Sequence, residues 1–326
     1  MSDKKELLSI QDLSVYYITK DMGTCQAVNH VSLDIHEGET IGLVGETGAG
    51  KTTIALSILG LIQSPPGKIV SGKIVYKNED LLTKNNKEMQ KIRGKEISMI
   101  FQDPMTTLNP IDTVGDQIAE VIELHSHIGK KEAVKKAAEM LEVVGIPKER
   151  YGEYPHQFSG GMKQRVVIAM ALACSPKLLL ADEPTTALDV TIQAQILEMM
   201  NELKKSYDGA IMLITHDLGV VAQMCDRVAI VYAGEILEIG TVYQVYKNIL
   251  HPYTKGLFES LPGYSKGKRL KQIDGLMPDP ADLPPLCKFE PRCPYSCERC
   301  KNEMPQLVDV GEGHMVRCLR AQEGQV

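Results

Sequence analysis

The stretch GLVGETGAGKTT, residues 42–53, constrains this chain more than any other part of its sequence. An apolar run precedes it and the run IALSILGLI follows it, so a strand, a glycine-rich turn and a helix are predicted in that order. Glycines let backbone N–H groups converge on one point, and the following helix directs the positive end of its dipole there. The stretch is therefore predicted to cradle phosphate groups.

The stretch fits the phosphate-loop pattern G-x-x-x-x-G-K-[ST] with Gly45, Gly50, Lys51 and Thr52 at its fixed positions. We expect the Lys51 ammonium to reach the β and γ phosphates of a nucleotide and the Thr52 hydroxyl to bind Mg2+. The candidate nucleotide-binding residues of the loop are Gly45, Glu46, Thr47, Gly48, Ala49, Gly50, Lys51, Thr52 and Thr53.

Two adjacent acids follow in KLLLADEP, residues 177–184. Asp182 ends an apolar strand, where its carboxylate is expected to hold Mg2+ through water. Glu183 is expected to polarise the attacking water as a general base. An acid pair at a strand end is an ordinary surface feature by itself, but the presence of Lys51 in the same chain favours the catalytic interpretation.

Short β-like runs alternate with helical segments, which is typical of an α/β fold. The runs at 178–181 and 211–215 are apolar at every position, as strands covered on both faces must be, so a parallel central sheet is predicted. The first 40 residues and residues 72–76 favour a small antiparallel layer. The run RVAIVYAGEILEIG, residues 227–240, is counted among the β-like runs.

Helical spacing dominates between Asn109 and Ala173 and returns at 191–205. The apolar positions expected to face the core of these helices are Val134, Ala138, Leu141, Val144, Ile192, Ile196, Met199 and Leu203. From about residue 262 the chain becomes rich in Pro, Gly and charge, which indicates a linker to a small terminal unit.

The charge and hydrophobicity of the chain argue against several classes of function and location. A net charge of -6 and no long Lys/Arg run argue against nucleic acid as a partner. The charged N-terminus lacks the apolar core of a secretory signal, so a cytoplasmic location is expected. The apolar stretch at 166–174 is about half the roughly 20 residues that a membrane-spanning helix needs.

The segment FSGGMKQR, residues 158–165, resembles the signature motif of ABC ATPases, although Phe158 and Met162 replace the Leu and Gln of its commoner form. Ser159 is expected to cap the next helix, with Gly160 and Gly161 leaving its first amides bare for a partner's ATP. The resemblance implies further roles for four residues. These are adenine stacking for Tyr17, Mg2+ contact and coupling for Gln102, the dimer interface for Asp189 and γ-phosphate contact for His216. Taken singly, Tyr17, Gln102 and His216 also have ordinary packing interpretations.

Five segments narrow the resemblance to the ATP-binding subunits of bacterial dipeptide and oligopeptide importers: GETGAGKT, FQDPMTTLNP, YPHQFSGGMKQR, ADEPTTALDVTIQAQI and HPYTKGLFESLP. The implied fold is an α/β P-loop NTPase of ABC type, with a RecA-like core, an antiparallel β subdomain, a helical subdomain at about 104–173 and a small Cys-rich C-terminal unit. Residues 1–262 would form the nucleotide-binding domain and residues 263–326 the extension.

The resemblance also implies partners and a location. The expected partners are a second, related ATPase subunit, two transmembrane permeases and an extracytoplasmic peptide-binding protein. This chain itself is expected at the cytoplasmic face of the inner membrane. ATP and Mg2+ are the implied substrate and cofactor. Relatives that carry nickel chelates or glutathione leave the transported substrate open.

Five cysteines lie between 287 and 318, and in a reducing compartment such a cluster favours a metal over disulfides. The resemblance implies a [4Fe-4S] cluster on Cys287, Cys293, Cys300 and Cys318, leaving Cys297 as a spare. Zinc on four sulfurs and disulfides both remain open as alternatives.

Two rival functions remain at the level of sequence. Soluble ABC ATPases of DNA repair carry long heptad arms, and those of translation carry two ATPase units; this chain has neither feature. The other rival is a metal-cluster sensor in which nucleotide only regulates assembly.

Overall fold

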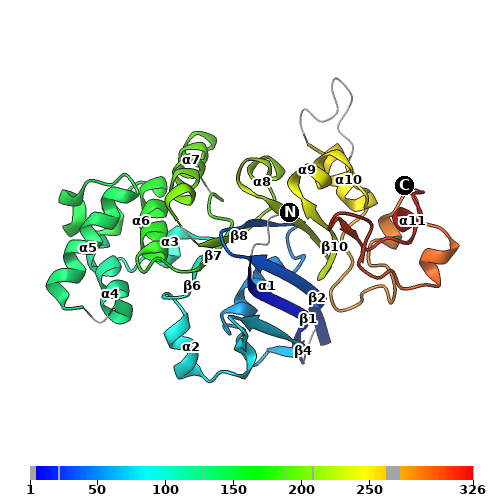
Figure 1. The fold of residues 1–326 in the computed structure, drawn as a ribbon, viewed down its shortest axis with the longest axis horizontal. Coiled ribbons are helices and arrows are strands. Elements are labelled where there is room, and N and C mark those ends of the chain that lie inside the picture. Colours follow the sequence, from blue (N-terminus) through cyan, green and yellow to red (C-terminus); the bar gives the residue numbers. More distant parts are fainter. Residues whose placement is uncertain are drawn as a thin grey trace. The chain divides into compact units, whose positions relative to one another are not determined.

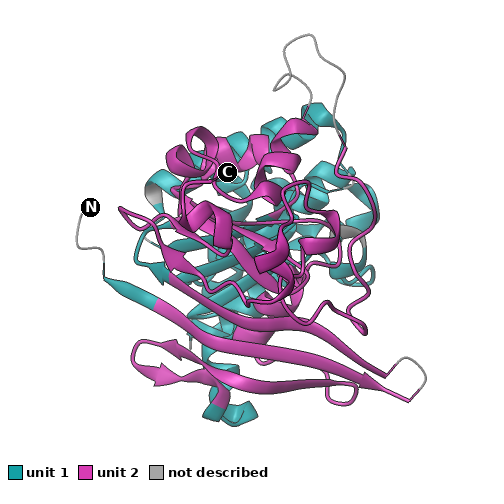
Figure 2. Cartoon of the chain, turned by 90° about the vertical axis from the view of Figure 1, so that its right-hand side faces the viewer, with its two compact units in different colours: residues 1–7, 35–39, 83–214 teal, residues 8–34, 40–82, 215–326 magenta. Residues whose placement is uncertain are grey.

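The computed structural model describes residues 5–20, 23–126, 128–186, 188–207, 209–261 and 272–325. Helices and strands alternate along the chain (Figure 1). The chain divides into two compact units, coloured in Figure 2: unit 1 comprises residues 1–7, 35–39 and 83–214, and unit 2 comprises residues 8–34, 40–82 and 215–326. Among the described residues, no helix has the length and apolarity needed to cross a bilayer.

Unit 2 contains the predicted antiparallel layer as a four-stranded sheet in the order β2-β1-β4-β5. Its register places Leu8 opposite Tyr76 and Tyr17 opposite Gly67. The strands are β1 (Glu6–Thr19), β2 (Gly23–His36), β4 (Gly67–Tyr76) and β5 (Glu79–Asp80).

A further run of strands in unit 2 has the order β11-β12-β10-β9-β3, in which β3 and β9 are parallel. Its strands are β3 (Thr40–Val44), β9 (Arg227–Tyr232), β10 (Glu235–Thr241), β11 (Val308–Asp309) and β12 (Met315–Val316). Every residue of β3 is buried, as expected for a strand covered on both faces. The other elements of unit 2 are α1 (Lys51–Ile58), η1 (Leu81–Thr83), α8 (Leu218–Met224), α9 (Val242–Lys247), α10 (Pro252–Glu259), η4 (Glu290–Arg292), η5 (Glu298–Lys301) and α11 (Leu319–Gln322).

The β-like run at 227–240 is an antiparallel hairpin of β9 and β10 rather than one strand. Ala233 and Gly234 both have positive φ, 46° and 79°, which is the conformation that a tight two-residue hairpin turn requires. The Gly at the second position was the local signal for this reversal.

A buried carboxylate connects the C-terminal residues to this sheet. Glu238 of β10 is fully buried and accepts hydrogen bonds from the backbone N–H groups of Leu250 (3.0 Å) and His251 (2.9 Å). The same carboxylate also contacts Nε2 of His314, the residue before β12, at 2.9 Å. The predicted domain boundary at 262/263 lies outside the described residues.

Unit 1 contains three parallel strands in the order β8-β7-β6, buried along their whole length. These are β6 (Ile97–Ile100), β7 (Leu178–Asp182) and β8 (Ala210–Thr215), as the apolar runs predicted. The helices are α2 (Asn86–Ile92), α3 (Pro104–Thr107), α4 (Val114–Ser126), α5 (Lys130–Val143), η2 (Lys148–Gly152), η3 (Pro155–Gln157), α6 (Gly160–Leu172) and α7 (Val190–Ser206).

The buried stripe of α5 differs from the predicted one. Ala133 and Ala137 are fully buried, whereas Val134 and Ala138 are only partly buried; Leu141 and Val144 face the core as predicted. Alanine lets two helix backbones approach closely, so shape outweighs side-chain hydrophobicity on this face.

Candidate functional site

The phosphate loop joins β3 to α1 in unit 2, in the predicted order of strand, turn and helix. Lys51 is the first residue of α1 and is buried, and its ammonium donates to the carbonyl oxygens of Gly45 (2.8 Å) and Glu46 (2.9 Å). No acidic residue lies in the first turn of α1. This end of the helix therefore keeps its positive potential for an anion.

The two outer glycines of the loop are required by close contacts with backbone. A Cβ on Gly45 would lie 2.0 Å from the carbonyl oxygen of Val231, and one on Gly50 would lie 2.2 Å from that of Ala27. Gly50 also has a φ of 98°, which residues with side chains rarely adopt. Backbone oxygens cannot move aside as side chains do, so only glycine fits at either position.

Glu46, the residue after Gly45, is held by groups that the sequence analysis did not single out. Arg292 forms an ion pair with its carboxylate at 3.1 Å, and the Tyr253 hydroxyl accepts a hydrogen bond from its backbone N–H at 3.1 Å. Neither contact has a local signal, because 246 and 207 positions separate the partners.

Tyr17 and His216 also belong to unit 2. Tyr17 lies on β1, and a Cβ on the opposing Gly67 would be 3.1 Å from its ring. His216 directly follows β8 and is exposed. A partly buried ring and an exposed imidazole are both compatible with contacting a nucleotide.

The predicted catalytic acids lie at the carboxyl end of β7 in unit 1. Asp182 is 2% exposed, and Glu183 is held at a φ of 46° with its N–H bonded to the Ile214 carbonyl (2.8 Å). Such a conformation is unfavourable for a residue with a side chain and marks a position where geometry is imposed by the surroundings.

Gln102 and Glu183 are brought together: Gln102 Nε2 donates to Glu183 Oε2 at 2.8 Å. The Thr186 hydroxyl donates to the same oxygen at 2.9 Å, a contact that the sequence analysis missed. The carboxylate is thus oriented by two neutral donors. The two contacts fix the direction in which this carboxylate points.

The signature segment also lies in unit 1, at the start of α6. Ser159 caps the helix, accepting from the Met162 N–H at 3.4 Å, as predicted. A Cβ on Gly161 would lie 2.4 Å from Ile192 of α7, whereas one on Gly160 would meet only Leu188 at 3.6 Å. Gly161 therefore serves helix packing, and Gly160 leaves the helix start uncovered.

The two unusual signature residues share a partner. The Arg150 guanidinium lies 4.2 Å from the centre of the Phe158 ring and its Nη1 is 3.3 Å from the Met162 sulfur. Asp189 caps α7 by accepting from the Ile192 N–H at 3.0 Å and is exposed.

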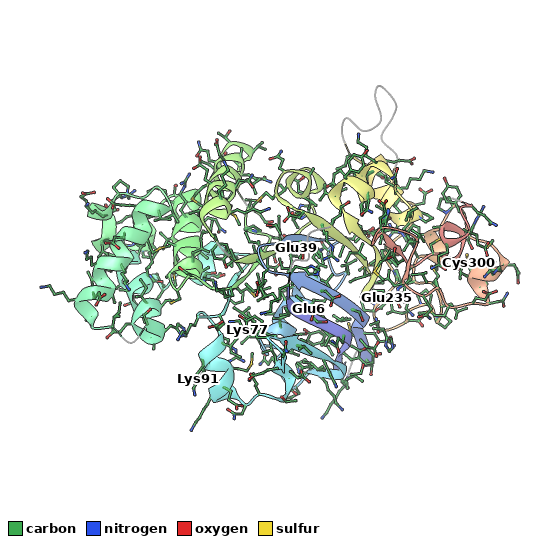
Figure 3. All side chains as sticks on the ribbon, viewed as in Figure 1. Glu6, Glu39, Lys77, Lys91, Glu235 and Cys300 are labelled. Atoms are coloured by element: carbon green, nitrogen blue, oxygen red, sulfur yellow. The ribbon has the colours of Figure 1, made fainter. Side chains whose placement is uncertain are left out.

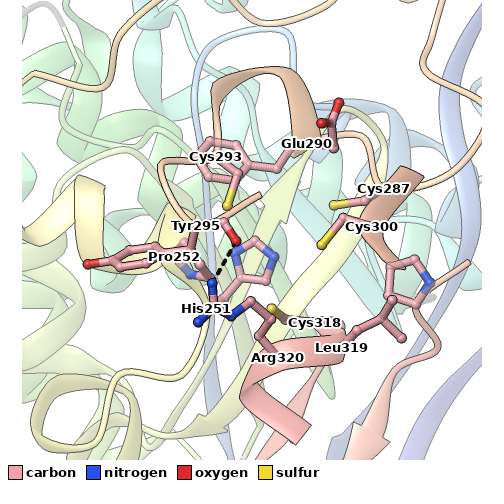
Figure 4. Close-up of a pocket in the computed structure, with 12 residues that line it drawn as sticks. His251, Pro252, Cys287, Glu290, Cys293, Tyr295, Cys300, Cys318, Leu319 and Arg320 are labelled. Carbon is pink, nitrogen blue, oxygen red and sulfur yellow. Dashed lines mark hydrogen bonds between the residues drawn. The ribbon is translucent and has the colours of Figure 1, made fainter. Parts of the chain in front are cut away.

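Four cysteines of the C-terminal segment line one small pocket in unit 2, shown in Figure 4. Cys300, labelled in Figure 3, belongs to η5. Cys287 precedes η4, Cys293 directly follows it, and Cys318 is the N-cap of α11. Burial, together with the charge of neighbouring cysteines, raises the pKa of the Cys287 thiol to about 12 and that of Cys293 to about 11. The lining residues are His251, Pro252, Cys287, Phe289, Glu290, Cys293, Tyr295, Cys300, Pro305, Cys318, Leu319 and Arg320.

Within the described part of the chain, no three His, Cys, Asp or Glu side chains are close enough together to hold a metal ion. Cys297 lies outside the pocket lining, and its sulfur is 3.5 Å from that of Cys300. Arg320 faces the pocket with Nη1 bonded to the Tyr295 carbonyl (3.1 Å), and its buried Nε has no hydrogen-bond partner among the described residues.

Comparison with known proteins gives consistent matches along the chain. The family model described as "ABC transporter" matches residues 28–186, and that described as "Oligopeptide/dipeptide transporter, C-terminal region" matches residues 237–300. A dipeptide transport ATP-binding protein of Bacillus subtilis is 51% identical over 96% of this chain and 94% of its own length. An oligopeptide transport ATP-binding protein of the same organism is 48% identical over 97% of each chain.

Solved structures agree on the fold. A dimeric ATP-binding cassette in a post-hydrolysis state, bound to ADP and Pi, aligns with a TM-score of 0.65 and 27% identity, covering 72% of this chain and 99% of that one. The protein cbiO1 of Clostridium perfringens, described as part of the ABC transporter complex cbiONQ, aligns with a TM-score of 0.64 and 26% identity, covering 75% of this chain and 92% of that one.

We predict that Gly45→Ala disrupts the loop, because its Cβ would collide with the Val231 carbonyl oxygen. The expected cost is about 1–3 kcal/mol in unfolding free energy, as for other overpacked positions, together with loss of nucleotide binding. Chemical denaturation and ATP titration measure the two effects. Gly152→Ala is the matched control, since nothing lies within 4 Å of its added Cβ; equal behaviour of the two variants would contradict the prediction.

Proposed function

This chain belongs to the ABC transporter ATPases, and on that premise we propose how its residues share the work of ATP-powered peptide import. The observation that carries the proposal is identity near 50% over the full length to dipeptide and oligopeptide transport ATP-binding proteins. The chain hydrolyses ATP, and the energy drives transport through a membrane complex.

In unit 2, Lys51 and the loop residues 45–53 bind the phosphates of ATP, Tyr17 stacks on adenine and His216 contacts the γ-phosphate. In unit 1, Glu183 is the general base, while Gln102 couples the site to the permease. Thr52, Asp182 and Gln102 offer the hydroxyl, carboxylate and amide oxygens that Mg2+ prefers, so these three residues would hold it. Mg2+, when bound, neutralises charge on the β and γ phosphates.

The signature residues Ser159, Gly160 and Gly161, with Asp189, serve the ATP of a second cassette. The proposal is supported by the exposed Gly160 and Asp189 and by the uncovered start of α6. An N-terminal helix end attracts a γ-phosphate through its unpaired N–H groups and dipole. The second cassette is a related ATPase chain, and the pair lies at the cytoplasmic face of the membrane. It works with two permeases and an extracytoplasmic substrate-binding protein.

We propose that the cysteine pocket would hold a metal cluster, with Cys287, Cys293, Cys300 and Cys318 as its ligands. Thiolates this close together repel one another, and burial disfavours the charge of Cys287 and of Cys293, so a cation among them removes both costs. The buried Nε of Arg320 has no hydrogen-bond partner in the part of the chain that the structure describes, and a sulfur anion in the pocket would supply one. The donor set therefore fits a [4Fe-4S] cluster, with zinc as the alternative. A bound cluster would cross-link four parts of a segment that has little core of its own.

We also propose the division into a nucleotide-binding domain, residues 1–262, and an extension, residues 263–326, with a helical subdomain at about 104–173. Helices α3 to α6 and the short helices between them support the subdomain. The extension shares its apolar core with β9, β10 and α10 through Phe289, Cys287 and Cys293.

Glu183→Gln is predicted to bind ATP normally while turnover falls by roughly 10²–10⁴-fold, because the amide cannot accept the proton from water. ATPase rate is measured in proteoliposomes containing both permeases, with and without the substrate-binding protein loaded with peptide. The wild-type rate should rise with loaded binding protein. Glu132→Gln, an exposed acid of α5, is the control. Substantial residual hydrolysis by Glu183→Gln would remove Glu183 as the base, and no response to peptide would remove the import function.

The same variant tests the second cassette, because ATP that is bound but not hydrolysed should trap the closed pair. Light scattering with ATP and Mg2+ is expected to show a stable dimer only when the related ATPase chain is present. Ser159→Arg should prevent pairing by blocking the start of α6. A stable dimer of this chain alone would contradict the proposed heteromeric pair.

Single cysteine substitutions test which cysteines bind the metal and whether Cys297 is dispensable. Anaerobically purified protein is expected to contain roughly four iron and four sulfide per chain. Cys293→Ser should lose them, whereas Cys297→Ser should retain them. Metal analysis and visible absorption provide the readout. Colourless protein with stoichiometric zinc would replace the cluster by the zinc alternative, and retention of iron by Cys293→Ser would exclude the ligand set.

A further inference from the structure

Glu46 places a carboxylate in the loop that is proposed to bind a triphosphate. Its backbone carbonyl accepts from Lys51 at 2.9 Å, so the residue is part of the loop itself and not of its flanks. Two anions a few ångströms apart repel each other strongly at the edge of a protein, where the effective dielectric constant is well below that of water. The loop therefore needs a group that neutralises Glu46 and holds it aside.

Arg292 is in position to do both. Its Nη1 donates to both carboxylate oxygens of Glu46, at 3.1 and 3.2 Å. The arginine side chain is 7% exposed and that of Glu46 is 30% exposed, so solvent screens this pair less than a surface pair. A partly buried ion pair of this kind costs more to break than an exposed one.

The remaining donors of Arg292 are fixed by the chain that precedes the cysteines. Its Nε donates to the Asp274 carbonyl at 3.0 Å, and Nη2 lies 3.5 Å from the Ile273 carbonyl. Nη1 also donates to the Tyr232 hydroxyl at 3.3 Å. With its guanidinium held on three sides, Arg292 presents the charge to Glu46 in one orientation.

Arg292 belongs to the short helix η4, directly before Cys293. Phe289, just before η4, packs against Tyr232 and Tyr253 with ring centres 5.4 Å apart in each case. Tyr253 in turn accepts from the Glu46 N–H. One turn of the C-terminal segment thus reaches the backbone of Glu46 through an aromatic cluster and its side chain through Arg292.

We propose that Arg292 is a positioning residue for nucleotide binding: it neutralises Glu46 and so allows the phosphate loop of its own chain to accept ATP. This inference rests on the proposed role of the loop in ATP binding. It assigns to the C-terminal segment an effect on the first step of the ATPase cycle, separate from any contact with a partner protein.

A double-mutant cycle tests the proposal through the ATP dissociation constant, measured by calorimetry with the full-length chain. Arg292→Ala is expected to weaken ATP binding by about tenfold or more, since it leaves the Glu46 charge unpaired beside the phosphates. In a Glu46→Gln background, the same Arg292→Ala change should alter affinity less than about threefold. Steady-state kinetics should show the loss in KM, with kcat little changed.

Two further variants make the outcome unambiguous. Arg299→Ala removes an arginine of the same segment that pairs with Glu303 and Glu323, and should leave ATP affinity unchanged. Lys51→Ala tests the loop itself: if it still binds ATP, the proposed nucleotide site fails. If Lys51→Ala abolishes binding but Arg292→Ala weakens it equally in both backgrounds, the role of Arg292 is overturned while the nucleotide site stands. Metal content of Arg292→Ala is measured in parallel, because a general collapse of the segment would not be rescued by Glu46→Gln.

Discussion

The contact between the phosphate loop and the backbone beneath it is the constraint on which the nucleotide site depends. Gly45 approaches the Val231 carbonyl and Gly50 approaches that of Ala27, with no room for a single carbon between them. The loop therefore takes its shape from strands β9 and β2, and not from its own side chains. A loop fixed in this way loses little conformational entropy when a ligand binds, which is the general benefit of a preorganised site.

In unit 1 a candidate site residue, Glu183, is held in place by backbone conformation and side-chain hydrogen bonds. Glu183 is held in a left-handed conformation by a backbone bond to Ile214, and its carboxylate is oriented by Gln102 and Thr186. The backbone conformation and the two neutral donors fix the direction of the carboxylate that we propose as the general base. In both units the chemistry sits where parallel strands end, because loops there are anchored on one side by a rigid sheet.

Features with local causes were predictable from the sequence. The phosphate loop, the cap formed by Ser159 and the buried strands depend on residues within a few positions of each other. The core stripe of α5 differs from the predicted one for a tertiary reason, because small alanines let the helices pack closely there. The reversal at Ala233 and Gly234, in contrast, has a local signal in its glycine.

The segment after residue 271 shows the same limit most clearly. Its composition predicts a linker, and residues 272–285 indeed form no helix or strand. Yet the carbonyls of Ile273 and Asp274 hold Arg292, and Met277 lies where a Cβ on Gly48 would touch it at 3.3 Å. In this irregular segment the backbone carbonyls accept hydrogen bonds from a distant arginine instead of from a helical neighbour. No local sequence pattern predicts that arginine as the partner.

The C-terminal segment and the phosphate loop therefore share one core. Phe289, Tyr232 and Tyr253 form an aromatic cluster that contacts the cysteine pocket on one part of its surface and Glu46 on another. Glu238 reinforces this connection, because its buried carboxylate needs the backbone N–H of His251, just before α10, and the contact with His314 to offset its loss of hydration. A terminal segment of this size cannot bury enough apolar surface to be stable alone, so it adds its aromatic ring to the core that supports the nucleotide loop.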